Sequence, residues 1–376
     1  MRIVLTGGGT GGHFYPLIAV AEALKSIARE EKFLDPDIYF LGPSAYDDKI
    51  LFEENIIYAK IPAGKLRRYF SLSNLTDTLK TFWGVVLAVF TLYRLYPDVV
   101  FAKGAYGSFP VLFAARLLSI PVIIHESDVA PGRVNAWAGK FAKRIAVSYP
   151  DALQYFPKDR VFVSGQPIRK RLQELVSEGA REFLKLEERL PVVLVLGGSQ
   201  GSTPINEALL GILPKLLQTC QVIHQTGENN FKDMESSAKV ILRGNSFATR
   251  YKPFAYLNEL AIRMSYAIAS LAVSRAGSSL LELAYAGIPV IVVPIREDVS
   301  HDQTKNSFAF GRAGAGIVIE EKNLTPNILD FEITRLLKDD TLRQKMSLAG
   351  KKLAAPEAAK KIAYEIANLA LAHEKN

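Results

Sequence analysis

The sequence is poor in cysteine, with one such residue, Cys220, among 376. A single cysteine excludes an internal disulfide and favours a reducing compartment. No secretory signal pattern precedes the first predicted strand at residues 2–6, so we expect a cytoplasmic protein. Cysteine and histidine spacings typical of zinc sites are absent as well, which speaks against a zinc protein.

Long basic runs and long apolar runs are also missing. The formal net charge is +8, and its dispersed basic residues favour an acidic substrate or an anionic membrane surface over nucleic acid. The most apolar segment, residues 82–93, ends at Arg94 and is shorter than the ~20 residues that a membrane-spanning helix needs. We therefore expect a mostly buried helix there.

The length and the hydrophobic content of 49% exceed what one ordinary core requires, so we expect two domains. Apolar, β-branched strands alternate with helical segments, which is typical of α/β proteins with parallel sheets. Each half begins with a strand, a glycine-rich loop and a helix, at residues 2–30 and 191–217. The first half contains predicted strands at 2–6, 38–41, 58–61, 98–101, 121–124, 144–147 and 161–163, and a polar stretch at 169–189 separates the halves.

Residues 271–294 combine several features of a ligand site. We expect a strand end, a glycine turn, a helix capped by Ser278 and a strand at 288–293 that is buried on both faces. A helix that begins at the carboxyl edge of a sheet favours an anionic ligand. Glu282, one helical turn after Ser278, can accept hydrogen bonds from hydroxyls beside a bound phosphate, such as those of a ribose. This segment alone is equally consistent with a solvated glutamate on an ordinary helix.

The first glycine-rich loop, Gly7–Gly12, precedes His13 and a predicted helix to about residue 30. It contains the pattern G-x-G-x-x-G of dinucleotide-binding proteins. That pattern requires an acidic residue at the end of the second strand, whereas strand 38–41 here is followed by Gly42 and a proline. A nicotinamide-dependent oxidoreductase is therefore the alternative function from a different class.

Polar residues cluster where the strands of the first half end. Residues 104–108 follow one predicted strand, and His125 to Asp128 follow another. Of the five histidines, His13, His125 and His224 are expected at such strand ends or in loops. Open α/β sheets bind their ligands at the carboxyl ends of the strands. A lone histidine there is usually structural, but this recurrence favours a binding or catalytic site.

Several motifs occur in order along the chain. They are GGGTGGH at 7–13, HE at 125–126, PIR at 167–169, GGSQG at 197–201, HQTG at 224–227, SRAG at 274–277 and DQ at 302–303. Together they resemble the motifs of the MurG family, over nearly the whole chain. This family has the GT-B architecture, in which two Rossmann-like domains with parallel sheets face each other across a cleft. It transfers N-acetylglucosamine from UDP to the 4-hydroxyl of the muramoyl sugar of undecaprenyl-linked lipid I, with inversion, in peptidoglycan synthesis.

The resemblance implies a hexosyltransferase that needs neither a metal nor another cofactor. It implies an acceptor-side and membrane-side domain at 1–166, completed by a C-terminal helix at 353–376, and a UDP-sugar-binding domain at 167–352. The implied partners are UDP-N-acetylglucosamine, lipid I and an anionic membrane surface, but no nucleic acid. The protein would be peripheral, on the cytoplasmic side of the membrane. A glycolipid synthase with another lipid acceptor is the alternative among transferases, and a UDP-sugar epimerase of similar fold is a further one.

The resemblance also assigns donor-binding residues. Asp128 and Gln303 would contact the donor sugar, and Leu257 would support the uracil. The other implied donor residues are Thr10, Gly11 and Gly12 beside the acetamido sugar, Arg169, Ser199 and Ser278 at the diphosphate, and Glu282 at the ribose. Three of them could instead have purely structural roles: a linker ion pair for Arg169, a helix cap for Ser199 and a solvated helix position for Gln303.

Three departures from the family affect these roles. The family usually has His-Glu-Gln-Asn where this chain has residues 125–128, so a carboxylate at Asp128 replaces an amide. The segment 277–282 is one residue shorter than in the family. Residues around Tyr106, which we assign to the acceptor side, also differ from those usual in the family.

Inverting transfer needs a general base, because a protonated sugar hydroxyl attacks poorly. His13 is one candidate, since a helix N-terminus disfavours imidazolium and keeps a proton-accepting form available. Asp128, at the end of a later strand, is the other. We favour His13, because a family that works with an amide at the Asp128 position does not need a carboxylate there for proton removal.

Because the acceptor of the family lies in a membrane, residues 65–83 are a candidate membrane-docking segment. Leu75, Leu79, Phe82 and Trp83 follow helical spacing after a Ser73 cap and three cations, Lys65, Arg67 and Arg68. Such a stripe can dock on anionic lipid or pack on the domain's own sheet. By resemblance we expect docking, with Phe82 and Trp83 on the membrane side.

Overall fold

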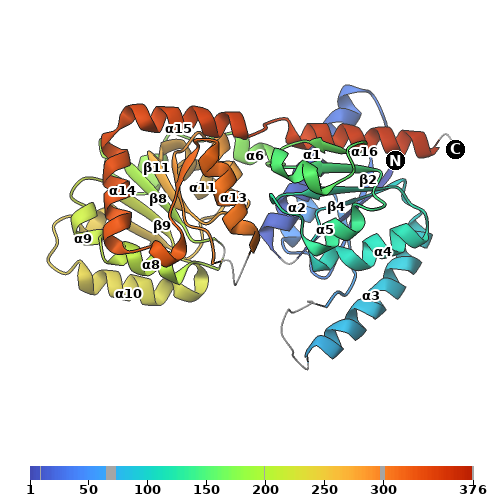
Figure 1. The fold of residues 1–376 in the computed structure, drawn as a ribbon, viewed down its shortest axis with the longest axis horizontal. Helices are drawn as coiled ribbons and strands as arrows, with labels where there is room; N and C mark the ends of the chain where they lie inside the picture. Colours follow the sequence, from blue (N-terminus) through green and yellow to red (C-terminus); the bar gives the residue numbers. More distant parts are fainter. Residues whose placement is uncertain (9, 65–72, 199, 297–300, 375–376) are drawn as a thin grey trace. The chain divides into compact units, whose positions relative to one another are not determined.

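A computed structural model of the protein describes residues 1–8, 10–64, 73–198, 200–296 and 301–374. The chain divides into two compact units (Figure 1). Unit 1 consists of Met1–Lys170 and Ala355–Asn376, and unit 2 consists of Arg171–Ala354. These limits differ by a few residues from the expected 166/167 and 352/353. Ser199 and the basic residues Lys65, Arg67 and Arg68 lie outside the described residues.

Unit 1 contains a sheet of seven strands, in the order β3-β2-β1-β4-β5-β6-β7, and every pair is parallel. Its central strands are uninterrupted apolar runs, as a sheet buried on both faces requires. The expectation of parallel α/β domains is confirmed. The strands are β1 (Arg2–Thr6), β2 (Asp37–Gly42), β3 (Ile57–Lys60), β4 (Val99–Ala102), β5 (Val122–Glu126), β6 (Arg144–Val147) and β7 (Val161–Val163).

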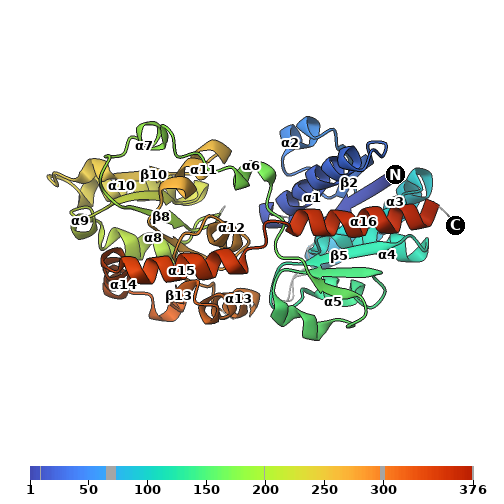
Figure 2. The same cartoon turned by 90° about the horizontal axis from the view of Figure 1, so that it is seen from above.

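Helices cover both faces of this sheet. Because side chains alternate along a strand, Ile3 and Leu5 of β1 pack on one face and Val4 packs on the other. The first face is covered by α1 (Gly11–Glu30), α2 (Asp48–Glu53) and α16 (Ala358–Glu374), and the second by α3 (Ser73–Leu95), α4 (Phe109–Leu117) and α5 (Arg133–Ala138). Helix α16 lies beside α1 (Figure 2). Two short 3₁₀ helices, η1 (Tyr106–Ser108) and η2 (Pro150–Tyr155), complete the unit.

Helix α3 is not the mostly buried helix that the sequence predicted. Only 17% of the most apolar window of Leu75–Leu95 is buried, and this segment is long and apolar enough to cross a membrane by length and composition alone. Those criteria are weak evidence for a span, because core helices of soluble proteins meet them too. Gly84, Ala88 and Leu92 form its buried stripe at four-residue spacing, and α3 packs there beside α4 (Figure 1).

The large apolar side chains in the first half of α3 are exposed on the surface of unit 1. Leu75 is 71% exposed, Phe82 is 67% exposed and Trp83 is 56% exposed, and Leu79 is exposed as well. Periodicity identifies an apolar stripe on this helix but not the direction in which it points, and here the inward stripe is the one that contains Gly84, Ala88 and Leu92. The alternative that this stripe packs on the domain's own sheet is thereby excluded.

Unit 2 contains a second parallel sheet, of six strands in the order β10-β9-β8-β11-β12-β13. The strand expected at 288–293 is shorter in the structure, although its flanking residues are also buried. The strands are β8 (Val192–Leu196), β9 (Gln221–Gln225), β10 (Tyr251–Phe254), β11 (Leu271–Ser274), β12 (Val290–Val292) and β13 (Gly316–Val318).

Two helical layers cover the sheet of unit 2. Helices α8 (Thr203–Leu210), α9 (Leu213–Leu216), α10 (Phe231–Ile241) and α14 (Pro326–Lys338) pack on one face, and α7 (Ala180–Phe183), α11 (Glu259–Ile268), α12 (Ser279–Tyr285) and α13 (His301–Arg312) pack on the other. Helix α15 (Asp340–Leu353) lies beside α12 and α14. The linking elements are α6 (Lys170–Gln173), η3 (Glu228–Asn230), η4 (Ala248–Arg250) and η5 (Glu321–Asn323).

The single helix expected to end near residue 217 is divided into α8 and α9. Pro214 lies in the first turn of α9. Proline has no amide hydrogen, and its ring clashes with the preceding turn of a continuous helix. A new helix therefore begins here, with the proline where it is tolerated.

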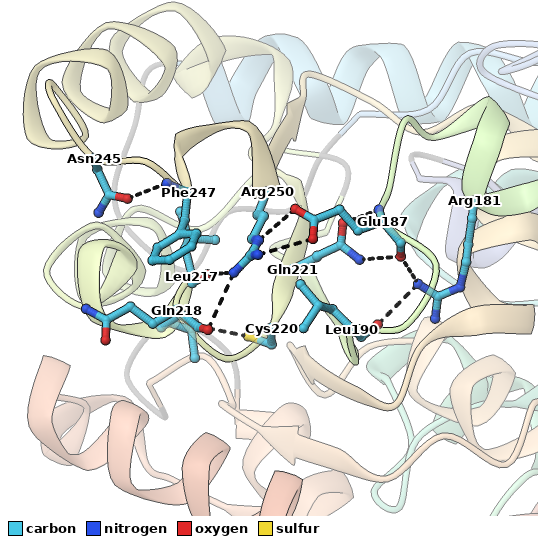
Figure 3. A network of polar contacts seen from close by, with 11 residues as sticks. Arg181, Glu187, Leu190, Leu217, Gln218, Cys220, Gln221, Asn245, Phe247 and Arg250 are labelled. Atoms are coloured by element: carbon cyan, nitrogen blue, oxygen red, sulfur yellow. Dashed lines mark hydrogen bonds and ion pairs between the residues drawn. The ribbon is translucent and has the colours of Figure 1, made fainter.

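A polar network fixes the chain where it enters the sheet of unit 2 (Figure 3). Arg250 donates to both carboxylate oxygens of Glu187, at 2.7 and 3.1 Å. The backbone of Glu187 exchanges two hydrogen bonds with the Gln221 side chain, at 2.7 and 2.9 Å. Arg181 donates to the carbonyl oxygens of Glu187 and Leu190. Gln221 begins β9, so the network lies at the amino edge of the sheet, opposite the glycine-rich loop that follows β8.

Candidate active site

Each sheet has one point at which its strand order reverses. In unit 1 this point lies between β1 and β4, and in unit 2 it lies between β8 and β11. Open parallel sheets bind ligands beside the carboxyl ends of such strands. The loop that carries His13 follows β1, and the helix that carries Glu282 follows β11. The candidate site residues are thus collected at the carboxyl edge of each unit.

In unit 1, helix α1 begins at Gly11 and positions His13 in its first turn. The Nδ1 atom of His13 lies 3.0 Å from Thr10 Oγ1. A Cβ at Gly11 would lie 2.9 Å from the Tyr46 hydroxyl and 3.1 Å from the Tyr15 ring, so a larger residue would displace these side chains. The amides of Gly11 and Gly12 belong to the first turn of the helix, where N–H groups have no partner within the helix. They are therefore suited to a polar or anionic ligand.

The His13 imidazole is half-buried. Its burial and the nearby positive charge of Lys103 lower the pKa of His13 to about 4. The side chain is therefore neutral near pH 7 and has one nitrogen able to accept a proton. The helix N-terminus predicted this direction of the pKa shift, and burial is a larger cause of it than the charge of Lys103.

Lys103, which the sequence analysis missed, directly follows β4 and is 1% exposed. Its ammonium donates a hydrogen bond to Ser127 Oγ. Burial lowers the pKa of Lys103 to about 8, although the charges of Glu126 and Asp128 act in the opposite direction. The sequence signal that could have identified Lys103 is its place directly after an apolar strand, at the point where the strand order reverses.

Glu126, at the end of β5, organises the loop that contains Asp128. Its Oε1 atom accepts from the Asp128 amide at 2.9 Å, and its Oε2 atom accepts from Gly132 N at 3.1 Å and from Asn135 Nδ2 at 2.9 Å. Burial and the charge of Asp128 raise the pKa of Glu126 to about 7, against the effect of these donors and of Lys103. Glu126 therefore holds Asp128, which is half-buried, at the edge of the sheet.

The Tyr106 segment has an unusual backbone. Ala105 has φ +63° and ψ 168°, a region that is essentially restricted to glycine. Gly104, with φ +87°, precedes it, and a Cβ there would lie 2.7 Å from Asn135 Nδ2. The Ser108 hydroxyl and amide both donate to the Ala105 carbonyl, at 2.9 and 3.2 Å. This turn positions Tyr106, which is half-buried, directly after β4 and beside β2.

Two of the singled-out histidines are core residues. His224 is fully buried between Asn206 Oδ1, at 3.0 Å, and the Tyr251 hydroxyl, at 2.8 Å. Burial lowers the pKa of His224 to about 3. His125 is also fully buried, and its Nε2 atom lies 3.0 Å from the Gly165 carbonyl. The recurrence of histidines at strand ends therefore has a structural cause at these two positions.

Arg169 belongs to unit 1, where its guanidinium lies 4.1 Å from the centre of the Tyr15 ring. Tyr15 is in α1, two residues after His13. A guanidinium above an aromatic ring is held by cation–π attraction. This contact fixes Arg169 near the His13 helix and accounts for its burial.

In unit 2, Glu282 lies in α12 with its carboxylate half-buried. The hydroxyl of Tyr266, a buried residue of α11, donates to Glu282 Oε2 at 3.1 Å. Burial and then the Glu282 charge raise the pKa of Tyr266 well above its ordinary value. Ser278 precedes α12 but makes no side-chain capping bond. The expected cap is therefore wrong, and sequence reasoning missed Tyr266 as the partner that orients Glu282.

Other predicted residues of unit 2 are held by local contacts. Leu257 is buried, and its amide donates to Gln225 Oε1 at 3.0 Å. Gln303 Oε1 accepts from Ile295 N at 3.3 Å. Within the described ranges, no group of three histidine, cysteine, aspartate or glutamate residues is arranged to hold a metal ion.

Comparison with known proteins provides a second line of evidence. Residues 3–147 match the glycosyltransferase family 28 N-terminal domain, and residues 192–362 match the corresponding C-terminal domain. A protein of Treponema denticola, described as UDP-N-acetylglucosamine–N-acetylmuramyl-(pentapeptide) pyrophosphoryl-undecaprenol N-acetylglucosamine transferase, is 36% identical over 90% of this chain and 87% of its own length. A protein of the same description from Lachnospira eligens is 35% identical over 90% of this chain and 91% of its own.

Solved structures show the same fold. Acinetobacter baumannii MurG matches with a TM-score of 0.73 and 24% identity, over 98% of this chain and 99% of that one. A UDP-GlcNAc 2-epimerase from Neisseria meningitidis matches with a TM-score of 0.72 and 15% identity, over 98% of this chain and 100% of that one. Transferases and epimerases therefore share this architecture, and only the sequence relationship separates them here.

Proposed function

Because this chain belongs to glycosyltransferase family 28 and, within it, to the MurG family, we propose that it transfers N-acetylglucosamine from UDP-N-acetylglucosamine to the 4-hydroxyl of the muramoyl sugar of lipid I. The protein is then a hexosyltransferase of peptidoglycan synthesis. The observation that carries this proposal is the relationship to the curated transferases across both domains. The oxidoreductase alternative lacks this support, and β2 ends at Gly42 without the acidic residue that it requires.

The proposed chemistry is a direct displacement with His13 as the general base. The acceptor oxygen bonds to the anomeric carbon on the face opposite UDP, and the bond from that carbon to the diphosphate oxygen breaks with its electron pair going to UDP. The hydroxyl proton passes to His13 Nε2. In the required tautomer His13 Nδ1–H donates to Thr10 Oγ1, and the low pKa keeps Nε2 unprotonated before the step.

The donor is proposed to bind through the residues that the family resemblance assigns to it. Glu282 accepts hydrogen bonds from the ribose hydroxyls, and Tyr266 holds its carboxylate in place. Leu257 supports the uracil, and Asp128 and Gln303 bind the sugar. The diphosphate charge is offset by the Arg169 guanidinium and by donors at Ser199 and Ser278, so that the proposal requires no metal. Tyr106 is assigned to the acceptor side.

The proposal places the protein peripherally on the cytoplasmic face of the membrane, where the lipid acceptor lies. The exposed apolar side chains Leu75, Leu79, Phe82 and Trp83 of α3 support this location. Exposed large apolar residues on one helix are unusual for a soluble surface and are suited to insertion at a lipid boundary. An anionic surface would also attract this protein of net charge +8.

One experiment tests the transfer and its alternatives together. The protein is incubated with UDP-N-acetylglucosamine and a short-chain lipid I analogue, or with diacylglycerol, and products are identified by mass spectrometry and NMR. We expect a β-linked disaccharide on the lipid I analogue, formed equally in the presence of EDTA. Product on diacylglycerol alone would indicate a glycolipid synthase. Conversion of the UDP-sugar without an acceptor would indicate an epimerase.

A further inference from the structure

A buried lysine lies between the two candidate bases of unit 1. Fully buried lysine is rare unless its charge is paired, yet Lys103 is 1% exposed. The strand before it, β4, pairs with β1 on one side and with β5 on the other. Lys103 therefore stands between the loop that leads to His13 and the loop that contains Asp128.

Contacts on both sides confirm this placement. A Cβ built on Gly7 would lie 3.4 Å from Lys103 Cβ, so the lysine stem packs against the glycine-rich loop. On the other side, its ammonium donates to Ser127 Oγ. Ser127 is flanked in the chain by Glu126 and Asp128, and these carboxylates supply the negative charge that a buried ammonium needs.

We propose that Lys103 is a positioning residue for proton removal: its ammonium holds the Ser127–Asp128 corner and sets the electrostatic potential at the His13 imidazole. A carboxylate at position 128 puts a negative charge near the Lys103 ammonium, where the family usually has an uncharged amide. Lys103 offsets that charge. Lys103, Asp128 and His13 thus act as one unit, and this inference rests on the proposed role of His13.

The ionisable groups around Lys103 explain how pH acts on this unit. Glu126 and Asp128 face it from the end of β5 and favour its charged form. Burial is the larger cause that lowers the pKa of His13 on α1 and of His125 on β5, and the lysine charge lowers both further. Since burial brings the pKa of Lys103 to about 8, its charge is lost as the pH rises through that value. Turnover of the wild type is then expected to fall above about pH 8.

The test compares Lys103→Met, which keeps the stem and removes the charge, with the surface variant Lys140→Met. Turnover and the donor Michaelis constant are measured from pH 6 to 9.5 with UDP-N-acetylglucosamine and a lipid I analogue. We expect Lys103→Met to lower turnover by about 10- to 100-fold, the range for a misplaced catalytic geometry. Its donor Michaelis constant should change less than its turnover, and the decline above pH 8 should disappear. Lys140→Met should match the wild type.

The pKa of His13 provides a readout besides activity. It is measured by NMR of carbon-labelled histidine, and the His13 signal is assigned as the one that is lost in His13→Gln. Removing the Lys103 charge should raise this pKa towards the ordinary value. In addition, Lys103→Met/Asp128→Asn should recover turnover relative to Lys103→Met, because the uncompensated carboxylate is gone. Unchanged turnover and an unchanged His13 pKa in a folded Lys103→Met protein would overturn the proposal, as would a double variant without recovery.

Ser127→Ala provides the test if Lys103→Met does not fold. It removes the hydroxyl that accepts the lysine hydrogen bond and keeps the charge, so turnover should fall while the pKa of His13 stays low. Wild-type turnover in Ser127→Ala would overturn the positioning role. Failure of the proposed function is distinguishable, since it appears as a wild type that does not transfer or as a His13→Gln variant that retains turnover.

Discussion

The Tyr266 hydroxyl donates a hydrogen bond to Glu282 Oε2 over 3.1 Å and joins α11 to α12. The tyrosine is buried, whereas the carboxylate is half-buried at the carboxyl edge of the sheet of unit 2. A carboxylate held by a buried donor keeps one orientation. Under the proposed role of Glu282, ligand hydroxyls would bind it without the entropic cost of ordering a mobile side chain.

The donor site is tested by removing either member of this pair. Glu282→Ala should weaken UDP binding strongly, by about 100-fold, since two hydrogen bonds to a charged acceptor are lost. Tyr266→Phe should weaken it by about three- to tenfold, because only the orientation of the carboxylate is affected. Calorimetric titration with UDP measures both, and Tyr285→Phe on α12 is the matched control. Wild-type affinity in Glu282→Ala would exclude the ribose assignment.

The identity of the general base is tested by removing either the proton-accepting nitrogen of His13 or the charge of Asp128. His13→Gln should lower turnover by about 100- to 10,000-fold with donor affinity nearly kept, since general base catalysis has this magnitude. Asp128→Asn should mainly change the donor Michaelis constant. Steady-state kinetics with both substrates distinguish the two. If Asp128→Asn loses turnover and His13→Gln keeps it, the base is Asp128.

The conformation of Ala105 predicts a stabilising substitution. A non-glycine residue in this region costs about 1–3 kcal/mol, part of which glycine loses again through its larger freedom in the unfolded chain. Ala105→Gly should therefore raise the free energy of unfolding of unit 1 by about 1 kcal/mol. Both tryptophans, Trp83 and Trp137, lie in unit 1, so their fluorescence during urea unfolding reports on it. Ala105→Ser keeps the strain and should show no gain.

The buried His224 predicts a pH dependence for unit 2. The unfolded chain binds a proton below the ordinary pKa of about 6.5, whereas folded His224 stays neutral down to a pKa of about 3. Stability is therefore lost as the pH falls, by about 2 kcal/mol between pH 7 and pH 5. Hydrogen exchange of β9, corrected for intrinsic rates, measures this change. In the His224→Gln variant the side chain at position 224 does not titrate in this range, so hydrogen exchange of β9 should depend less on pH.

The exposed face of α3 predicts membrane binding. Phe82→Ser/Trp83→Ser should reduce sedimentation with vesicles that contain phosphatidylglycerol by at least about tenfold, since each large side chain contributes about 1.5–3 kcal/mol when buried. Phe331→Ser removes a residue that is 63% exposed on unit 2 and should leave binding unchanged. Equal sedimentation of the α3 variant and the wild type would exclude this surface.

The sequence predicted the sheets well because their strands are buried on both faces. A short, uninterrupted, mostly β-branched run such as Val192–Leu196 is typical of a buried parallel strand, and the observed strand limits differ from the predicted ones by no more than two residues. Helix α3 was predicted less well. Periodicity identifies an apolar face but does not distinguish one that packs inward from one that is exposed at the surface.

The candidate site residues also differ in how far local sequence alone can indicate them. The glycine-rich loop and Glu282 could be proposed as site residues because helix starts at strand ends follow from local sequence. Lys103 was missed because its burial depends on Ser127 and on two carboxylates that a distant strand brings to it. His224 was singled out although it is a core residue. A histidine that is hydrogen-bonded to Asn206 and Tyr251 in the core has the same local sequence pattern as one that faces a ligand.

The return of α16 to unit 1 has a consequence for biosynthesis. Ile362, Ala363, Ile366 and Ala370 of this helix belong to the same buried cluster as α1. The ribosome therefore makes the whole of unit 2, a continuous segment, before it supplies the element that closes the core of unit 1. Domains generally fold as units during synthesis. Unit 2 can complete its fold first, and unit 1 must wait, with the apolar surface of α1 uncovered, until α16 emerges.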